Sequence, residues 1–539
     1  MSDQSAGIEL KTFRAASSAA ASVADSTTTY TDTATLLIPN DTAGPRKDSE
    51  GFRFLDFLKF VGPGFMIGVG YLDPGNWATD LAAGSQFGYS LLFIILTANI
   101  MATVLQYLCI KLGIVTNNDL AMSCRKHFSP SVNICLYILC ELAIIATDLA
   151  EVIGTAIALN LLFALPLVWG VALTSLDVLI VLAFWGSNNL RKFEFAIIGL
   201  VGLVAICFLY LVIASRPVLG EVLLGFLPST SIFHVDGQLY LAIGIIGATI
   251  MPHNLYLHSS IVRYRSNAES SNLGEISDLP PQPETLDSEI TQPMKRLKTI
   301  HQDIRYSNLD SVVALYGALL INSAILIVAA AEFFKSGDGK VAEIKDAYFL
   351  LIKHLGPAAG FVFALALFCA GQSSTITGTL AGQVVTEGFL GPTAAAKFKP
   401  SLQRLVTRLL AIVPAMTAAI VTGEKGMNEL LVASQVVLSL QLPFAVWPLV
   451  WVTCGAGDGL GMNVSFVRDF QAVPVSEAVM ELEDSVDEGG KEDEDGKEDD
   501  GKDTVVVDFA NKGALKVAAI LIAVLITVFN VVLLVNMAI

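Results

Sequence analysis

The sequence predicts an all-α polytopic membrane protein in which two membrane helices are interrupted at their centres. The first observation is composition: the 539 residues are 53% hydrophobic and only 15% charged, with a mean hydropathy of +0.62. Soluble domains carry about 25% charged residues. The second observation is a succession of apolar runs of spanning length, and the third is a proline with polar neighbours in the middle of two of these runs.

The charge of the chain is concentrated in one segment. Residues 477–503 carry 14 acidic residues against three Lys, out of a net charge of −17 for the whole chain. We interpret this segment as a solvated acidic loop, and no basic patch suited to nucleic acid is present in the sequence. The seven Cys are scattered without a C-x-x-C pair, which predicts neither a zinc cluster nor a disulfide framework.

The apolar runs predict about eleven membrane spans, since a span needs about 17–25 residues. The eighth run is long enough for more than one helix, and we expect one long, tilted or bent helix with an amphipathic approach. The runs are Leu55–Ala83, Leu91–Leu112, Val132–Leu162, Leu167–Trp185, Phe193–Ala214, Leu239–Val262, Leu309–Phe333, Ala347–Leu390, Leu405–Val421, Leu430–Val452 and Ala514–Met537.

The loops after even-numbered spans are the more basic ones, which predicts a cytosolic N-terminus. The Ser-, Thr- and Ala-rich start of the chain has no apolar core of a signal peptide, so we expect an uncleaved, disordered tail. The predicted divisions are the tail 1–50, a first five-helix repeat 51–220, a second repeat 221–455 with a flexible cytosolic linker 266–307, an acidic cytosolic loop 456–511, and an eleventh helix 512–539.

The first interruption is the stretch Tyr71–Asn76, inside the first apolar run. Pro74 lacks an N–H and Gly75 removes the side-chain constraint, so the helix should break there. A charge at mid-membrane is costly, which makes Asp73 a functional-site hypothesis. The break would free backbone carbonyls beside a carboxylate and an amide, the lining of a cation site. The alternative is a proline kink in which the Asp caps the second half-helix.

The second interruption is the stretch Ala248–Asn254, with Pro252 at its centre. Two interrupted segments in corresponding positions of two halves indicate the binding site of an inverted-repeat transporter. The thioether of Met251 suits softer divalent ions, and together with the oxygens of the first break it predicts Mn²⁺ or Fe²⁺ rather than Ca²⁺ or Mg²⁺. The alternative for this Met is gap-filling packing.

Proton carriers are also present within the apolar runs. His253 and His258 share the sixth span, where imidazole can exchange a proton near neutral pH or serve only as a hydrogen-bonding residue. Asp148 and Glu151 stand three residues apart in the third span, and two such carboxylates are not both cheaply ionised. The structural alternative is pairing with one of two arginines of the ninth span, which are Arg404 and Arg408.

Together these stretches resemble the Nramp family of proton-coupled divalent metal ion transporters (natural resistance-associated macrophage protein type). The resemblance runs from about Gly62 to Leu449 and implies a LeuT-type inverted repeat of 5+5 helices with broken first and sixth helices, plus one extra C-terminal helix. The motifs that carry it are Asp73–Asn76, Gln106, Lys111–Thr116, Thr147–Glu151, Met251–His258 and Leu438–Phe444.

The resemblance also implies roles for individual residues. The implied metal ligands are Asp73, Asn76, Met251, the carbonyls of Ala248 and Gly70, and Gln435 in the occluded state. The proton route that we expect comprises His253, His258, Asp148, Glu151 and Arg404. This chain departs from the family at Gln403-Arg404, where relatives often carry two adjacent Arg, and at Gly70, where they often carry Ala.

The expected function is proton-coupled symport of manganese and iron toward the cytosol by alternating access. We expect no enzyme activity and no resident cofactor, since no P-loop and no H-E-x-x-H motif is present in the sequence. Expected partners are divalent metal ions, protons and the lipid bilayer of a plasma, vacuolar or endosomal membrane, without nucleic acid; the tail and the acidic loop are where we expect regulatory partners. The alternatives are a sodium- or proton-coupled amino-acid carrier of the same fold and a non-transporting metal sensor.

Overall fold

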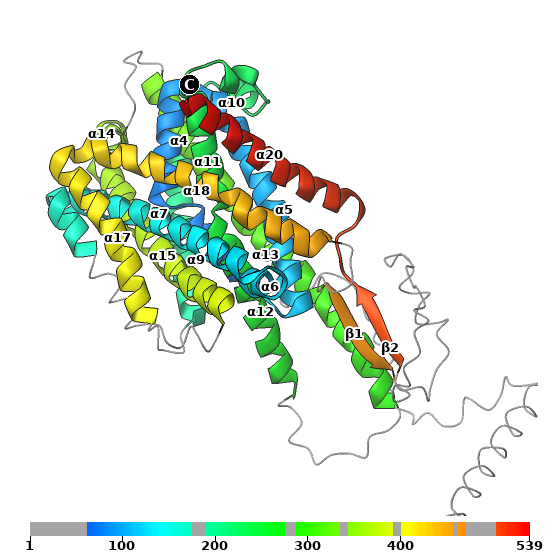
Figure 1. The fold of residues 1–539 in the computed structure, drawn as a ribbon. Coiled ribbons are helices and arrows are strands. Elements are labelled where there is room, and N and C mark those ends of the chain that lie inside the picture. The colour runs from blue at the N-terminus through cyan, green and yellow to red at the C-terminus, as the bar shows by residue number, and fades with distance from the viewer. Residues whose placement is uncertain are drawn as a thin grey trace, which may run out of the picture. The chain divides into compact units, whose positions relative to one another are not determined.

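The structure is a computed structural model that describes residues 62–174, 190–274, 287–334, 343–391, 400–455, 462–468 and 503–538. The predicted tail 1–50 and nearly all of the acidic run 477–503 lie outside these residues. The elements (Figure 1) are α3 (Pro63–Gly70), α4 (Pro74–Phe87), η1 (Gly88–Leu91), α5 (Leu92–Thr116), α6 (Leu120–His127), α7 (Pro130–Phe163), α9 (Leu190–Ser215), α10 (Leu219–Gly225), η2 (Thr230–Phe233), α11 (Gln238–Ile250), α12 (Pro252–Gly274), α13 (Asp287–Ala329), the π turn η3 (Ala330–Phe334), α14 (Ile344–Leu355), α15 (Pro357–Leu390), α17 (Pro400–Val421), α18 (Gly423–Cys454), β1 (Asn463–Arg468), β2 (Asp503–Asp508) and α20 (Gly513–Ala538).

Seven helical stretches among the described residues are long and apolar enough to cross a membrane. Two shorter apolar helices accompany them, at Gly202–Ser215 and Leu405–Val421. The predicted span Leu167–Trp185 is described only as far as Thr174, so the total of eleven stays a prediction. The seven stretches are Pro74–Thr116, Pro130–Phe163, Gln238–Ser266, Thr299–Phe334, Pro357–Leu390, Gly423–Cys454 and Gly513–Ala538.

Both predicted interruptions are confirmed. The first span consists of α3 and α4 with three non-helical residues between them, and the sixth consists of α11 and α12 with Met251 between them. In both cases proline begins the second half, at position N1, where a missing N–H costs nothing. The same proline removes the hydrogen bond that would have continued the first half, so the local sequence sets the position of each break.

Three features differ from the sequence-based expectations. The eighth run is two helices rather than one, because Gly356 adopts a φ of 89° and separates the amphipathic α14 from α15. The predicted linker 266–307 is helical at both ends, since α12 continues to Gly274 and α13 begins at Asp287, and residues 275–286 lie outside the described part. A two-stranded antiparallel sheet, β1 paired with β2, stands on either side of the acidic run, although no strand was expected there.

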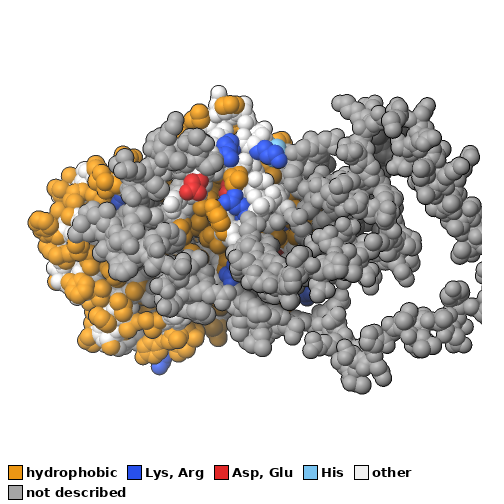
Figure 2. Space-filling view, turned by 90° about the horizontal axis from the view of Figure 1, so that it is seen from below, with side chains coloured by type: hydrophobic (Ala, Val, Ile, Leu, Met, Phe, Trp, Pro, Cys, Tyr) orange, Lys and Arg blue, Asp and Glu red, His pale blue; other side chains and the backbone are white. Residues whose placement is uncertain are grey.

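The two broken helices lie inside the bundle, covered by the longer helices. α13 packs against α3, α4 and α5, while α18 packs against α7 and α11. The final helix α20 lies outside this arrangement, alongside α18 (Figure 1). Figure 2 views the end from which α12 and α13 project, where several Lys and Arg side chains gather on the described surface. This distribution agrees with the predicted cytosolic end of the bundle, where α6 ends in Arg125 and Lys126.

Candidate metal site

The first break presents one free carboxylate oxygen to the interior of the protein. Asp73 is fully buried and caps α4: its Oδ1 accepts the backbone N–H of Asn76 at 2.9 Å and the side-chain amide of Asn76 at 2.5 Å. Its Oδ2 has no hydrogen-bond partner among the described residues. The capping alternative from the sequence is therefore realised, but it uses only one of the two carboxylate oxygens. The second oxygen is placed to bind a cation.

Each proline leaves one backbone carbonyl without its helical partner. An α-helical N–H bonds the carbonyl four residues earlier, so Pro74 frees the carbonyl of Gly70 and Pro252 frees that of Ala248. These are the two carbonyls that the family resemblance implies as metal ligands. The side-chain amide of Asn76 donates to the Ala248 carbonyl at 3.0 Å, so one residue joins the carboxylate of the first break to the carbonyl of the second.

Met251 lies at the second break in a strained backbone conformation. Its φ is 37°, a left-handed value that is uncommon for a residue with a side chain, and strain of this kind persists where the surroundings enforce it. The thioether is fully buried and accepts a hydrogen bond from Asn254 Nδ2 at 3.5 Å. A Cβ added at Gly70 would lie 2.7 Å from the same amide nitrogen, so Asn254 lies between the two breaks.

Gln435 on α18 reaches the first break. A Cβ added at Gly75 would lie 1.9 Å from Gln435 Nε2 and 2.9 Å from Asp73 Oδ2, so the carboxamide and the free carboxylate oxygen both line the space over this glycine. Gln435 Nε2 donates to Ser434 Oγ at 3.0 Å, while its Oε1 has no hydrogen-bond partner in the described part of the chain. The structure therefore brings Asp73, Asn76, the Ala248 carbonyl and Gln435 together at the junction of the two breaks. Gly70 and Met251 both lie beside the Asn254 amide.

Two further residues, Asn322 and Asn254, lie at the breaks, and the sequence reasoning did not place them at the site. Asn322 on α13 donates to the Tyr71 carbonyl at 3.0 Å and approaches Asn76 Oδ1 at 3.5 Å. Asn254 was quoted only as part of a motif. Both are asparagines in apolar runs, which is the signal that could have identified them, but the default interpretation of such residues is an ordinary interhelical hydrogen bond.

The two histidines of α12 differ in their surroundings. His258 Nδ1 lies 2.6 Å from Gln106 Oε1, and because a carboxamide oxygen only accepts, this nitrogen carries the proton. Gln106 Nε2 donates in turn to the hydroxyl of Tyr71 at 2.9 Å, so a chain of hydrogen bonds links α12 through α5 to the first break. His253 is buried within two residues of Met251.

Asp148 and Glu151 on α7 share one arginine. Arg408 NH1 lies 3.6 Å from Asp148 Oδ1 and 3.2 Å from Glu151 Oε2, and all three side chains are at most 1% exposed. Of the two arginines that the sequence suggested, Arg408 makes these ion pairs, while the side chain of Arg404 lies outside the described residues. In the described part of the chain, two buried carboxylates thus face the same guanidinium, and two such acids are not both cheaply ionised.

Gln403, which stands where relatives often carry a second Arg, contacts a carboxylate in the structure. Gln403 Nε2 donates to Glu141 Oε1 at 2.8 Å and contacts the hydroxyl of Thr386. The neutral carboxamide thus meets a carboxylate of α7 without supplying a charge. Glu141 precedes Asp148 by about two helical turns along α7.

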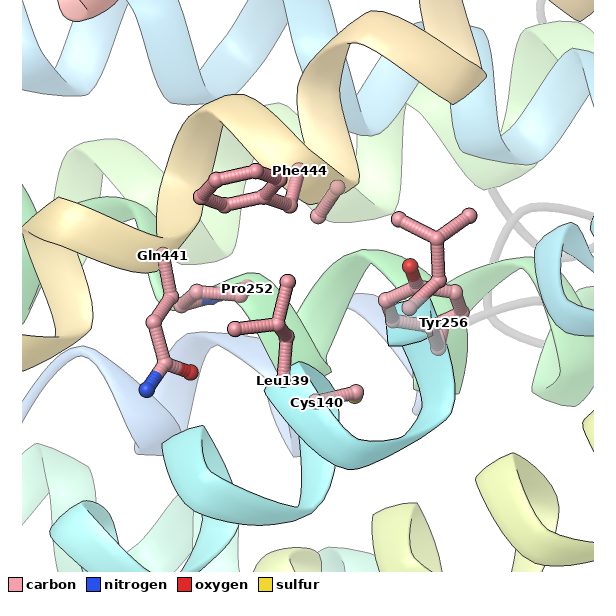
Figure 3. A pocket seen from close by; sticks show the side chains of 8 residues that line it. Leu139, Cys140, Pro252, Tyr256, Gln441 and Phe444 are labelled. Atoms are coloured by element: carbon pink, nitrogen blue, oxygen red, sulfur yellow. The ribbon is translucent and has the colours of Figure 1, made fainter. Parts of the chain in front are cut away.

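A small pocket lies beside Pro252, at the start of α12 (Figure 3). Its volume is about 10 Å³, close to the space that a single water molecule needs. α7, α12 and α18 line it, and its polar groups include the carboxamide of Gln441 and the thiol of Cys140. Met251, the residue before Pro252, packs with Ala143 of α7 and Leu438 of α18.

Comparisons with known proteins agree with this geometry. The family model described as natural resistance-associated macrophage protein-like, Nramp, matches residues 64–456. The chain is 51% identical over 421 residues to the divalent metal cation transporter MntH of a Nostoc species, covering 78% of this chain and 86% of that protein. It is 49% identical over 415 residues to MntH of Listeria innocua, covering 77% of this chain and 85% of that protein.

Among solved structures, the manganese transporter of Eremococcus coleocola superposes with a TM-score of 0.67 at 32% identity, covering 90% of this chain and 87% of that one. This match supports the predicted helical membrane fold as well as the family. Sequence, fold and comparisons lead to the same conclusion: the chain is a multi-pass integral membrane protein of the Nramp family.

Proposed function

We propose that this chain is a proton-coupled symporter that moves Mn²⁺ and Fe²⁺ toward the cytosol by alternating access. Its relatives are named as divalent metal cation transporters, and transport rather than catalysis is the activity of such proteins. The coarser statement, a divalent metal cation transporter, follows from family membership. The coupling ion, the direction and the choice of metal form the proposal.

The observation that carries the proposal is the junction of the two helix breaks. Asn76 bridges the carboxylate of Asp73 and the carbonyl of Ala248, while Asp73 Oδ2 and Gln435 Oε1 both remain without hydrogen-bond partners in the described region. Two unsatisfied buried oxygens are costly unless a cation or a proton meets them. An amino-acid substrate would instead need N–H groups facing its carboxylate, and at the first break the carboxylate belongs to the protein.

The thioether of Met251 supports a transition metal as the substrate. Mn²⁺ and Fe²⁺ accept a soft ligand beside oxygen, while Ca²⁺ and Mg²⁺ prefer oxygen throughout. Met251 follows Ala248 by three residues, and its buried sulfur lies beside the Asn254 amide. This position supports contact between the sulfur and an ion held by the two breaks. We therefore propose Asp73, Asn76, Met251, the Ala248 and Gly70 carbonyls and Gln435 as the ligands.

Protons would leave by way of α7. When Asp73 binds a divalent cation it gives up its proton, and the pair Asp148 and Glu151 can receive it, because two carboxylates that face the same arginine within a membrane helix are not both cheaply ionised. His253 lies next to the second break and is proposed as the intermediate carrier. His258, joined to Gln106, is proposed to assist the same route, and Arg404 to flank it.

Uptake into vesicles tests the proposal. The full chain is reconstituted into liposomes with an acidic exterior. The liposomes should accumulate Mn²⁺, and their lumen should become more acidic as the metal enters. An amino-acid carrier would accumulate no metal, and a pure sensor would accumulate nothing. Metal uptake without any proton movement would leave a metal transporter but would contradict the coupling.

A further inference from the structure

The helix α20 lies outside the ten helices of the two predicted repeats, yet it places a single asparagine against α18. Asn530 is 4% exposed and stands in the most apolar spanning stretch of the described chain. Its Nδ2 donates to the Ser439 carbonyl at 2.8 Å and to its own Ile526 carbonyl at 3.0 Å, and its Oδ1 lies 3.2 Å from Ser439 Oγ. Burying a polar side chain in a membrane helix costs free energy, so a residue so placed is a candidate for a functional role.

The carbonyl that Asn530 reaches is one that a proline has freed. Pro443 lies inside α18, and because it has no N–H, the Ser439 carbonyl four residues earlier has lost its helical donor. The metal site contains the same device: Pro252 frees the Ala248 carbonyl, and Asn76 from another helix donates to it at 3.0 Å. In both cases an asparagine on a neighbouring helix replaces the missing backbone donor.

The segment that Asn530 holds is the one that carries Gln435. Ser439 follows Gln435 by one helical turn, and α11 lies very close to both residues. A Cβ added at Gly247 would be 2.1 Å from the Gln435 carbonyl and 2.6 Å from the Ser439 N–H nitrogen. Residues 435–439 of α18 are therefore held between the half-helix that ends at the second break and the side chain of Asn530.

α20 also packs on both of the elements that meet there. Leu533 shares a buried cluster with Ile243 of α11 and Val436 of α18, and Phe529 packs against the same cluster. A shift of α20 would thus change its packing against both α18, which carries Gln435, and α11, which carries Ala248. The hydrogen bonds of Asn530 are the polar part of this contact.

We propose that Asn530 is a positioning residue for the substrate ion: by bonding the Ser439 carbonyl that Pro443 frees, it fixes the turn of α18 that brings Gln435 to the first break. The inference rests on the proposed transport of Mn²⁺ and on the proposed role of Gln435 as a ligand. It assigns a role in ion binding to a helix that supplies none of the ligands proposed above.

The test combines two substitutions in the full chain, reconstituted in liposomes, with Mn²⁺ as the probe. Asn530→Leu keeps the size of the side chain but removes the donor, and should raise the KM for Mn²⁺ by about tenfold with little change in maximal rate, as expected for one unsatisfied buried carbonyl beside the site. Pro443→Ala restores the backbone N–H, so in that background Asn530→Leu should change the KM by less than about threefold.

A matched control removes another contact between the same two helices. Thr527 accepts a hydrogen bond from Trp447 Nε1 at 3.1 Å on the exposed side of the α18–α20 contact, so Thr527→Val should leave the KM unchanged. The dependence of uptake on external pH should be the same in all variants, because the hydrogen bonds of Asn530 within the described residues go to Ser439 and Ile526 and not to the group around Arg408. A general loss of folding would instead lower the maximal rate without this selective change in KM.

Three results would overturn the proposal. One is an unchanged KM in Asn530→Leu, and another is an equal rise of the KM with and without Pro443→Ala. If Asn530→Leu does not fold, Asn530→Ser serves in its place, since a Ser hydroxyl bonds its own helix and leaves the Ser439 carbonyl without a donor; an unchanged KM in that variant is the third. A wild-type chain that carries no Mn²⁺ would overturn the proposed function itself, which distinguishes the two failures.

Discussion

Gly75 is a position where only a hydrogen atom fits, because the Gln435 carboxamide and Asp73 Oδ2 occupy the space of a Cβ. The substitution Gly75→Ala should push Gln435 away from the carboxylate and raise the KM for Mn²⁺ by about tenfold, the size expected for loss of one buried polar contact. Uptake assays at varied Mn²⁺ give the result. Gly202→Ala is the matched control, since nothing lies within 4 Å of a Cβ there; equal KM values in the two variants would contradict the placement of Gln435.

Met251 is the residue on which metal selectivity depends in this account. In Met251→Ala the ion keeps its oxygen ligands, so Mn²⁺ uptake should persist, while Ca²⁺ should begin to compete or to be carried. Competition assays in vesicles measure this change. Leu438→Ala removes another side chain of the same buried cluster and should leave discrimination against Ca²⁺ intact. Undiminished discrimination in Met251→Ala would remove the argument from the thioether.

The sequence identified the residues with unusual chemistry but only some of their partners. Asp73, Met251 and the two acids of α7 stand out because charge or sulfur beside a break is rare in an apolar run. Arg408, 257 residues from Glu151, was one of two arginines named as candidate partners, whereas Asn322, which bonds the Tyr71 carbonyl at a separation of 251 residues, was not placed at the site. Such contacts depend on how the helices pack, and no local pattern in one sequence encodes them.

At the scale of elements, the positions of the prolines determine which backbone carbonyls lose their helical hydrogen bond and can bind other groups. Pro74 and Pro252 each begin a half-helix and free one carbonyl, which is why both breaks could be predicted. The separation of α14 from α15 depends on Gly356 at a φ of 89°, and the Gly-Pro pair marks it in the sequence, but it was interpreted as a bend. The β1–β2 pair could not be predicted because its two strands are separated by the long acidic run.

The contact between α7 and α17 gives a prediction at the same scale. Glu151→Gln removes one of the two carboxylates that face Arg408, and with it one of the two acids proposed to receive the proton. Mn²⁺ binding should persist while metal-dependent acidification of the vesicle lumen falls. A pH-sensitive dye in the lumen measures it.

Glu429→Gln is the control for this variant. Glu429 is 70% exposed and lies 4.0 Å from Lys425 on the surface of α18, so its loss should not affect acidification. Acidification that is the same in Glu151→Gln as in the wild type would exclude this carboxylate from the proton route.

Across the whole molecule, both halves of the chain contribute residues to the candidate metal site. Asn76 of the first half donates to the Ala248 carbonyl of the second, 172 residues away, and α13 and α18 of the second half bring Asn322 and Gln435 to the same place. Composition and the succession of apolar runs were sufficient to predict a helical membrane protein, and the two interrupted spans predicted where its helices break; that the breaks form a cation site stays a prediction. The role of α20 was not predicted, because one Asn in an apolar span gives no indication of the carbonyl that it meets.

The central claim is that a carboxylate from one broken helix and a sulfur from the other hold the same ion. X-ray absorption spectroscopy of Mn²⁺ bound to the purified full chain measures the ligand atoms directly. The account predicts a shell of oxygen atoms with one sulfur, which disappears in Met251→Ala and remains in Met427→Ala, a change at another fully buried methionine. A shell of oxygen alone in the wild-type protein would contradict it.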